Sequence, residues 1–241
     1  VKVGLSPVLI GMMERGEIGA LALHGAGAIH DWEIAAIGAT SEDVATALPL
    51  GRFGMAEETG RAINEAAAEA ARRGEGLGET LGRRIAEAGL PHADLSLLAR
   101  AWQLGIPATV HVAIGSDIVH QHPSADGAAI GAASHTDFRR LVSVVSGLAE
   151  GVWINCGSAV QLPEVFLKAL SVAENLGGRL PGFSTANLDM ARHYRTEENV
   201  LRRPTLGRGR SFALVGHHEI NVPLLAAAVA IERRRRAAGS R

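Results

Sequence analysis

Five short apolar segments in this chain are each followed by a cluster of small and polar residues and then by a helical pattern. These segments are residues 18–24, 109–114, 152–155, 180–185 and 211–215. Strands that alternate with helices of about ten to fifteen residues are typical of a parallel sheet covered by helices on both faces. The sequence therefore predicts a single α/β domain over residues 1–241, built as three layers around a parallel sheet.

Composition narrows the class of protein further. With 241 residues, of which 47% are hydrophobic, the chain can bury a sizeable core, and its net charge of −1 gives no electrostatic reason to expect nucleic acid. The single cysteine, Cys156, excludes an internal disulfide and suits a reducing compartment. The apolar run 222–231 is too short to span a bilayer. We expect a cytoplasmic protein that binds neither nucleic acid nor a membrane.

The polar clusters that follow the five segments predict where a ligand would bind. They are His24-Gly25, Gly115-Ser116-Asp117, Cys156-Gly157-Ser158, Thr185-Ala186-Asn187 and Gly216-His217-His218. The carboxyl ends of parallel strands lie on one edge of a sheet, and ligands of open α/β sheets bind along that edge. Glycine and polar residues are also ordinary turn formers. Because histidines and carboxylates accompany the turns, we favour a small-molecule site.

The stretch 21–33 has the pattern of a strand, a glycine turn and a helix start. Gly25 and Gly27 would let the backbone approach a phosphate or ribose closely, and the helix N-terminus would offer free N–H groups to an anion. The dinucleotide fingerprint is incomplete, because His30 stands where a third glycine would be. A carboxylate next to a histidine suits general-base chemistry, so His30 and Asp31 are candidates for proton transfer.

Two further histidines, His120 and His122, lie in the loop 115–131. Histidines two apart on an extended segment point the same way and can share a metal. No cysteine or carboxylate stands nearby at standard ligand spacing, so we favour acid–base or substrate-binding roles and predict no metal site. Cys156 could be a nucleophile at a helix N-terminus, although a small buried thiol is the commoner alternative.

Several segments, taken in chain order over residues 4–225, resemble motifs of the deoxyhypusine synthases. They are Leu5-Ser6-Pro7-Val8, the stretch 24–31, Gly105-Ile106-Pro107 with Ala125-Asp126-Gly127-Ala128, Cys156-Gly157-Ser158, Ser184-Thr185-Ala186-Asn187 and the stretch 217–225. The stretch 24–33 also resembles the Ala-Gly-Asn-Ala-x-x-His-Asp-x-Glu motif of the NAD-dependent ornithine cyclodeaminase domain. The resemblance to the deoxyhypusine synthases implies a Rossmann-like parallel α/β fold of their type.

The same resemblance implies bound NAD and a homotetramer with active sites at subunit interfaces. The residues that it assigns to NAD are Ser6, Gly25, Ala26, Gly27, Ala28, Asp126, Gly127, Gly157, Ser158, Thr185, Ala186, Gly216 and His217. The imine-forming lysine of the family is missing, since the matching region holds Arg202 and Arg203. A guanidinium stays protonated and is not a nucleophile, so we do not expect authentic deoxyhypusine synthesis.

We therefore expect an NAD-dependent transferase or lyase, a bacterial relative of that family, which transiently oxidises a small amine- or hydroxyl-bearing substrate. The expected catalytic residues are His30, Asp31, His120 and His122, and the expected substrate-binding residues are Glu33, Asp117, His218 and Glu219. Two alternatives stay open. One is a metal-assisted hydrolase or lyase built on the histidines, and the other is a nucleotide-binding regulatory protein without catalysis.

Overall fold

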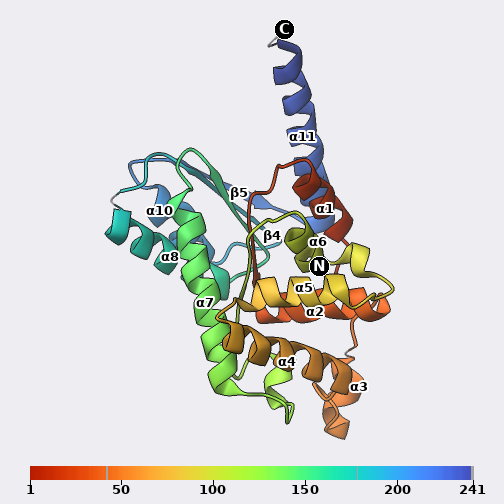
Figure 1. Ribbon diagram of the computed structural model, residues 1–241. Coiled ribbons are helices and arrows are strands. Elements are labelled where there is room, and N and C mark those ends of the chain that lie inside the picture. Colours follow the sequence, from red (N-terminus) through yellow and green to blue (C-terminus); the bar gives the residue numbers. More distant parts are fainter. Residues whose placement is uncertain (42, 178, 240–241) are drawn as a thin grey trace.

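The computed structural model describes residues 1–41, 43–177 and 179–239, and all five of its strands run in parallel sheets (Figure 1). β1 (Leu21–His24) pairs with β2 (Ala108–His111). In the second sheet, β4 (Ser184–Asp189) lies between β3 (Val152–Cys156) and β5 (Arg210–Val215). The α/β class with parallel strands is confirmed, but the strands pair as two sheets rather than as the single sheet expected from the sequence.

Helices connect the strands. The first half of the chain contains α1 (Ser6–Glu14), α2 (Gly25–Ile37), α3 (Val44–Ala47), α4 (Glu57–Arg73), α5 (Leu77–Glu87) and α6 (Leu97–Gln103), with 3₁₀ turns η1 (Leu48–Leu50) and η2 (Ala93–Leu95). The second half contains the 3₁₀ turn η3 (Ile118–Gln121), α7 (Gly127–Ser146), α8 (Gln161–Gly177), α9 (Tyr194–Thr196), the π-helical η4 (Glu197–Arg202), α10 (Arg203–Thr205) and α11 (His218–Gly239).

Side chains of α7 bond to the free backbone edge of β2, where the first sheet ends. The backbone amide of Val110 donates to Asp137 Oδ2 at 2.9 Å, and the amide of Val112 donates to Ser134 Oγ at 3.2 Å. Both acceptors lie on α7, which packs along β2. Because buried backbone N–H groups need acceptors, these side chains take the place of a further strand.

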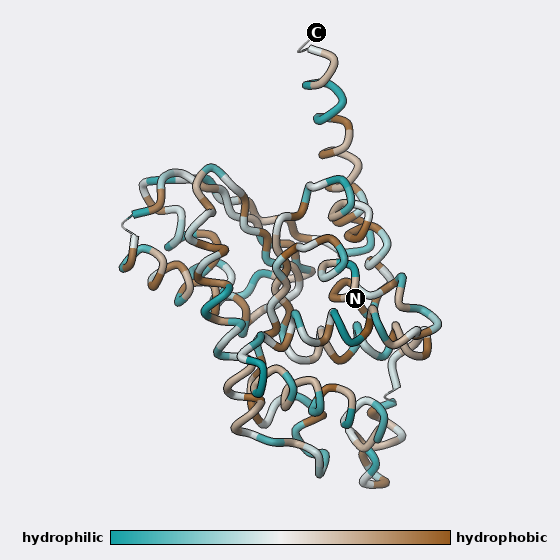
Figure 2. Tube along the Cα trace, in the orientation of Figure 1, coloured by the Kyte–Doolittle hydropathy of each residue, from teal (hydrophilic) through white to brown (hydrophobic). Residues whose placement is uncertain are grey.

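Three apolar clusters hold the elements together. The largest packs α2, α4, α5 and α6 around β1 and β2. In the second, Trp153 of β3 stacks on Phe166 of α8 with ring centroids 4.1 Å apart. In the third, Leu5 and Val222, from the chain beside α1 and from α11, cover Leu188 of β4. Hydrophobic and hydrophilic residues alternate along the helices, as expected of elements with one buried face (Figure 2).

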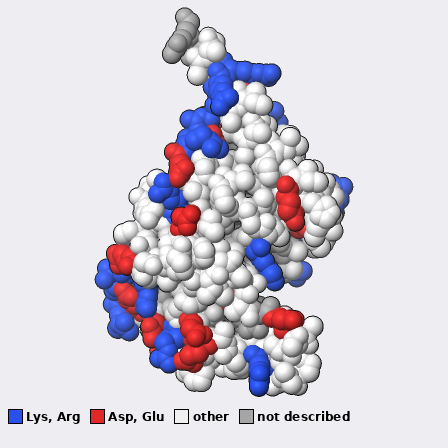
Figure 3. All heavy atoms as spheres, turned by 90° about the vertical axis from the view of Figure 1, so that its right-hand side faces the viewer, with Lys and Arg blue, Asp and Glu red and all other residues white. Residues whose placement is uncertain are grey.

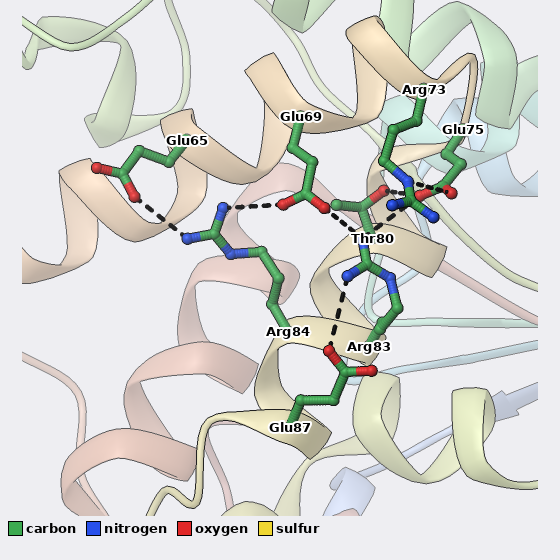
Figure 4. A network of polar contacts seen from close by, with 8 residues as sticks. All are labelled: Glu65, Glu69, Arg73, Glu75, Thr80, Arg83, Arg84 and Glu87. Carbon is green, nitrogen blue, oxygen red and sulfur yellow. Dashed lines mark hydrogen bonds and ion pairs between the residues drawn. The ribbon is translucent and has the colours of Figure 1, made fainter.

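A network of ion pairs fastens the outer faces of α4 and α5 to each other (Figure 4). Arg83 and Arg84 of α5 both reach Glu69 of α4, at 2.6 and 3.2 Å. The network also includes Glu65, Arg73, Glu75, Thr80 and Glu87. Its charged side chains are partly exposed, so each ion pair is screened by solvent and contributes little alone.

The helix α11 extends away from the rest of the molecule (Figure 1). Arg233 ties it to the chain near α1, by donating to the carbonyl of Arg15 and to Glu17. Arginines gather on its projecting end (Figure 3), as expected for cations near a helix C-terminus. Among the described residues, no helix combines the length and the hydrophobicity needed to cross a bilayer.

Candidate functional site

The start of α2 differs from the glycine turn expected there. Residues 25–28 form the first helical turn, because His24 caps the helix: its Nδ1 accepts a hydrogen bond from the Gly27 amide at 3.0 Å. The carboxylate of Asp117 lies directly against Gly25, where a Cβ would clash with it. Gly25 therefore allows the close approach of a side chain of this chain, and that carboxylate lies where a phosphate was expected.

Asp117 and His120 form the centre of this site, at the carboxyl ends of β1 and β2. Their side chains are 5% and 8% exposed, and His120 Nε2 lies 4.0 Å from Asp117 Oδ2. The Gly115 amide donates to His120 Nδ1 at 3.1 Å, so the neutral imidazole carries its proton on Nε2. Within the described part of the chain, Asp117 Oδ2 has no hydrogen-bond partner.

The environment shifts the acid–base behaviour of both Asp117 and His24. Burial raises the pKa of Asp117, while the nearby charge of His120 opposes the shift. Burial lowers the pKa of His24, and the charge of Asp117 opposes that shift. These directions favour a protonatable carboxyl beside a neutral imidazole, and pairs whose pKa values are displaced in this way are typical of catalytic sites.

A cavity of about 10 Å³ adjoins this centre. Asn64, Asp117 and His120 are the polar side chains among its otherwise apolar lining. Its volume is close to the roughly 10 to 15 Å³ that one water molecule requires. Like Asp117, the buried Asn64 presents an oxygen, Oδ1, that has no partner among the described residues.

His122 lies in the same loop as Asp117 and His120, but its side chain contacts other residues. Its Nε2 lies 2.6 Å from Glu57 Oε2, at the start of α4, and its Nδ1 lies 2.7 Å from Ser124 Oγ. His120 and His122, two of the three histidines predicted to be catalytic, therefore belong to two separate arrangements. One contains His120, Asp117 and His24, and the other contains His122, Glu57 and Ser124.

The structure gives Asp31 and Glu33 hydrogen-bonding partners within the fold, and their participation in the chemistry stays a prediction. The fully buried Asp31 accepts hydrogen bonds from the amides of Leu97 and Leu98, at 2.8 and 3.0 Å, and from the Ser96 hydroxyl at 2.6 Å. Asp31 thus holds the start of α6.

The carboxylate of Glu33 is also buried and accepts from the hydroxyl groups of Ser41 and Thr59. His30 is half-buried one turn into α2, and burial lowers its pKa. Adjacent residues of a helix point in different directions, so the pair His30-Asp31 does not act as one unit.

Four of the residues predicted to contact NAD are likewise part of helix starts. Asp126 caps α7 by accepting from the amides of Ala128 and Ala129, at 2.9 and 3.1 Å, and Gly127 is the first residue of that helix. Ser158 Oγ accepts from the Leu162 amide at the start of α8. Ser6 is buried as the first residue of α1, and its Oγ has no partner in the part of the chain that is described.

The strand β4 ends at Asp189, four residues after the expected end at residue 185. Thr185 and Ala186 are buried within β4, paired in register with Ser211 and Phe212, so they do not lie at the strand ends. Asp189 ends the strand instead, and the expected boundary had missed it.

The turns that follow the two neighbouring strands, β3 and β5, form backbone hydrogen bonds to the end of β4. The Gly157 amide donates to the carbonyl of Leu188 at 3.0 Å, and the Gly216 amide donates to the carbonyl of Asp189 at 2.9 Å. Gly157 has a φ of 69°, which favours glycine. The expected site residues His217 and Glu219 lie beside this edge and are exposed.

Cys156, at the end of β3, lies beside His218 at the start of α11, with Sγ 3.6 Å from Nδ1. Cys156 is an exposed residue, so it is not the buried thiol considered from the sequence, but partial removal of water from around its sulfur raises the pKa of the thiol. A thiol that stays protonated at neutral pH is a poor nucleophile. The predicted substrate residue His218 thus faces a thiol.

No protein-family model, curated protein or solved structure matches the chain.

The described residues contain no group of three or more His, Cys, Asp or Glu side chains that could hold a metal ion. Carboxylates fill the starts of α2 and α7, and their negative charge would repel a phosphate, so these residues do not fit NAD as expected.

Proposed function

We propose that this chain is an enzyme that removes a proton from a small hydroxyl- or amine-bearing substrate. The proposed site lies at the carboxyl ends of β1 and β2. One observation carries the proposal: the buried carboxylate Asp117 lies beside His24 and His120, and its Oδ2 has no hydrogen-bond partner among the residues that the structure describes. A raised pKa makes Asp117 a stronger base than an ordinary carboxylate.

The imidazoles supply the complementary groups. Backbone amides donate to Nδ1 of both His24 and His120, so each neutral ring carries its proton on Nε2 and acts as a donor. The cavity beside Asp117 has room for about one water molecule, so that water would pass the substrate proton to Asp117 Oδ2, while an Nε2–H group would donate to the oxygen or nitrogen on which charge develops. A carboxylate base paired with a neutral imidazole donor is an established arrangement for moving protons at pH 7.

The test uses a metabolite extract, because the substrate is unidentified. Wild-type protein, Asp117→Asn and, as a control, the exposed His135→Gln are each incubated with the extract, and the small molecules are compared by mass spectrometry. We expect the wild type and the control to convert the same compound, and Asp117→Asn to convert it at least about 100-fold more slowly. An extract left unchanged by the wild type would overturn the proposal and favour the regulatory alternative.

A second candidate function, NAD-dependent transient oxidation, is favoured at the β3–β4–β5 edge. Asp189 ends the central strand between the turns at Gly157 and Gly216. In dinucleotide-binding folds, an acidic residue beside a glycine turn accepts a hydrogen bond from the ribose. When bound, NAD would accept a hydride from the substrate.

Calorimetric titration with NAD, with Asp189→Asn for comparison, tests this second candidate. We expect the wild type to bind NAD and the variant to bind it at least about tenfold more weakly. Absence of binding to the wild type would remove this candidate and leave the proton-transfer proposal standing.

We also propose a homo-oligomer, with the tetramer implied by the family resemblance as the expected state. Val152 and Ile154 of β3 are 60% and 44% exposed, and Phe212 of β5 is 49% exposed. The strand register places all three on one face of the sheet. Apolar side chains gathered on an exposed face favour burial against a partner. Size-exclusion chromatography with light scattering measures the oligomeric state, and a monomer would contradict the proposed oligomer.

A further inference from the structure

A continuous chain of hydrogen bonds links Ser124 and His122, in the loop that precedes α7, to Glu57 at the start of α4. Ser124 Oγ lies 2.7 Å from His122 Nδ1, and His122 Nε2 lies 2.6 Å from Glu57 Oε2. A hydroxyl in contact with an imidazole, which a carboxylate holds from its other side, is the arrangement that activates serine nucleophiles.

The surrounding hydrogen bonds fix the tautomer of His122. The Ser124 amide donates to Nδ1 at 3.2 Å, so Nδ1 is an acceptor and the proton of the neutral ring lies on Nε2. Nε2–H then donates to Glu57, leaving the Nδ1 lone pair facing the Ser124 hydroxyl. This is the tautomer in which the imidazole can accept the proton of the hydroxyl.

Two neighbouring residues hold this arrangement in place. Gly60 of α4 makes room for the imidazole, since a Cβ there would lie 2.6 Å from His122 Cγ. The buried Asn64 donates from Nδ2 to Ser124 Oγ at 3.0 Å and to the carbonyl of Val119 at 2.9 Å. A donor aimed at Oγ stabilises the negative charge that forms as the hydroxyl loses its proton.

The carboxylate is also in the required state. Its hydrogen bond to His122 is the largest influence that lowers the pKa of Glu57, and Arg61 adds to it. Ser124 is half-buried beside the exposed Pro123, so its hydroxyl lies near the surface and does not belong to the core.

We propose that Ser124 is a nucleophile for acyl transfer from small carboxylic esters, with His122 as its base and Glu57 as the group that orients His122. Ser124 Oγ forms a bond to the ester carbonyl carbon as its proton passes to His122 Nδ1. The C–O bond to the alcohol then breaks, and the alcohol leaves with that proton. Water, deprotonated by His122, then bonds to the acyl carbon, the bond from this carbon to Ser124 Oγ breaks to release the acid, and Oγ takes back a proton from His122. This chemistry is independent of the proton transfer at Asp117.

A fluorophosphonate probe tests the nucleophile directly, because Ser124 Oγ would displace its fluoride and keep the phosphonyl group. The full chain is treated at neutral pH and its peptides are mapped by mass spectrometry. We expect the adduct on Ser124 in the wild type and in Ser116→Ala, a control at an exposed serine of the same loop, and no adduct at this position in Ser124→Ala.

Two further variants separate catalysis from a purely structural role. We expect His122→Gln to label at least tenfold more slowly, and Glu57→Gln, which keeps an acceptor but loses the charge, also to label more slowly. Folded wild-type protein with no adduct on Ser124 would overturn the proposal, as would equal labelling rates in wild type and a folded His122→Gln. Since the wild-type result decides without any variant, a variant that fails to fold does not leave the question open.

Discussion

Asp137 Oδ2 accepts a hydrogen bond from the backbone amide of Val110 at 2.9 Å, inside the core of the molecule. The same oxygen accepts from the Gly78 amide, also at 2.9 Å, at the start of α5. One fully buried side chain of α7 therefore holds both the edge of β2 and a neighbouring helix. Burial raises the pKa of Asp137 to about 7, despite the two amides that favour its charged form.

Asp137 makes stability depend on pH. Its folded-state pKa of about 7 lies above its ordinary value, so its contribution is fully present below about pH 4 and is lost as the pH rises through about 7. Asp137→Asn keeps an acceptor oxygen but cannot titrate. Between about pH 5 and pH 8, we expect the wild type to lose on the order of 2 kcal/mol of unfolding free energy relative to the variant, measured by urea unfolding. Parallel pH profiles would contradict this.

His111, next to Val110 on β2, acts in the opposite direction. Burial lowers its pKa to about 4, so its contribution is present above about pH 6.5 and is lost as the pH falls through about 4. Between these values the effects of Asp137 and His111 oppose each other. We expect stability to fall on acidification in Asp137→Asn and to rise on acidification in His111→Gln. If both variants follow the wild-type profile, neither group titrates as described.

Gly25 and Gly127 provide a matched pair, because each is the first residue of a helix. A Cβ at Gly25 would clash with the Asp117 carboxylate, whereas a Cβ at Gly127 would meet nothing within 4 Å. We expect Gly25→Ala to destabilise the protein by about 1 to 3 kcal/mol and to displace Asp117, and Gly127→Ala to be neutral within about 1 kcal/mol. Thermal unfolding measures both, and equal effects would show that Asp117 does not pack against Gly25.

Asp31→Ala tests the structural role of the buried carboxylate. The substitution leaves two backbone amides and the Ser96 hydroxyl without their acceptor. Each unsatisfied buried group costs about 1 to 3 kcal/mol, so we expect a loss of at least 2 kcal/mol of unfolding free energy. A variant with wild-type stability but without conversion in the metabolite assay would restore Asp31 as a candidate for the chemistry.

The sequence predicted most of the elements, and its main error was at β4. The apolar residues before Ser184 resemble a strand, but Leu180 and Phe183 pack against helices instead. The true strand is rich in polar residues that are nevertheless buried. Asn187, for example, accepts a hydrogen bond from Asn155 of the neighbouring strand at 2.7 Å. Hydrophobic periodicity cannot reveal a strand whose buried side chains satisfy one another by hydrogen bonding.

The candidate site was predicted in part. Asp117 and His120 follow β2 in the chain, in the loop and the turn η3 beyond its last residue, and chain order alone predicts this. His24 was recognised only as part of a turn, since capping depends on the direction of its side chain. Glu57 and Asn64 were missed as site residues because they lie about 60 positions before their partners in the loop. The adjacency of His30 and Asp31 was misleading, because neighbours in a helix do not share a face.

The acidic side chains at the starts of α2, α6 and α7 have a practical consequence for ligand discovery. In many α/β proteins a bound phosphate completes a helix start, so the ligand raises the melting temperature by mass action. Here Asp117, Asp31 and Asp126 complete those positions from within the chain. A melting-temperature screen of anions should therefore give little signal at these three helices, and a substrate will be found more readily by its conversion than by its stabilisation of the fold.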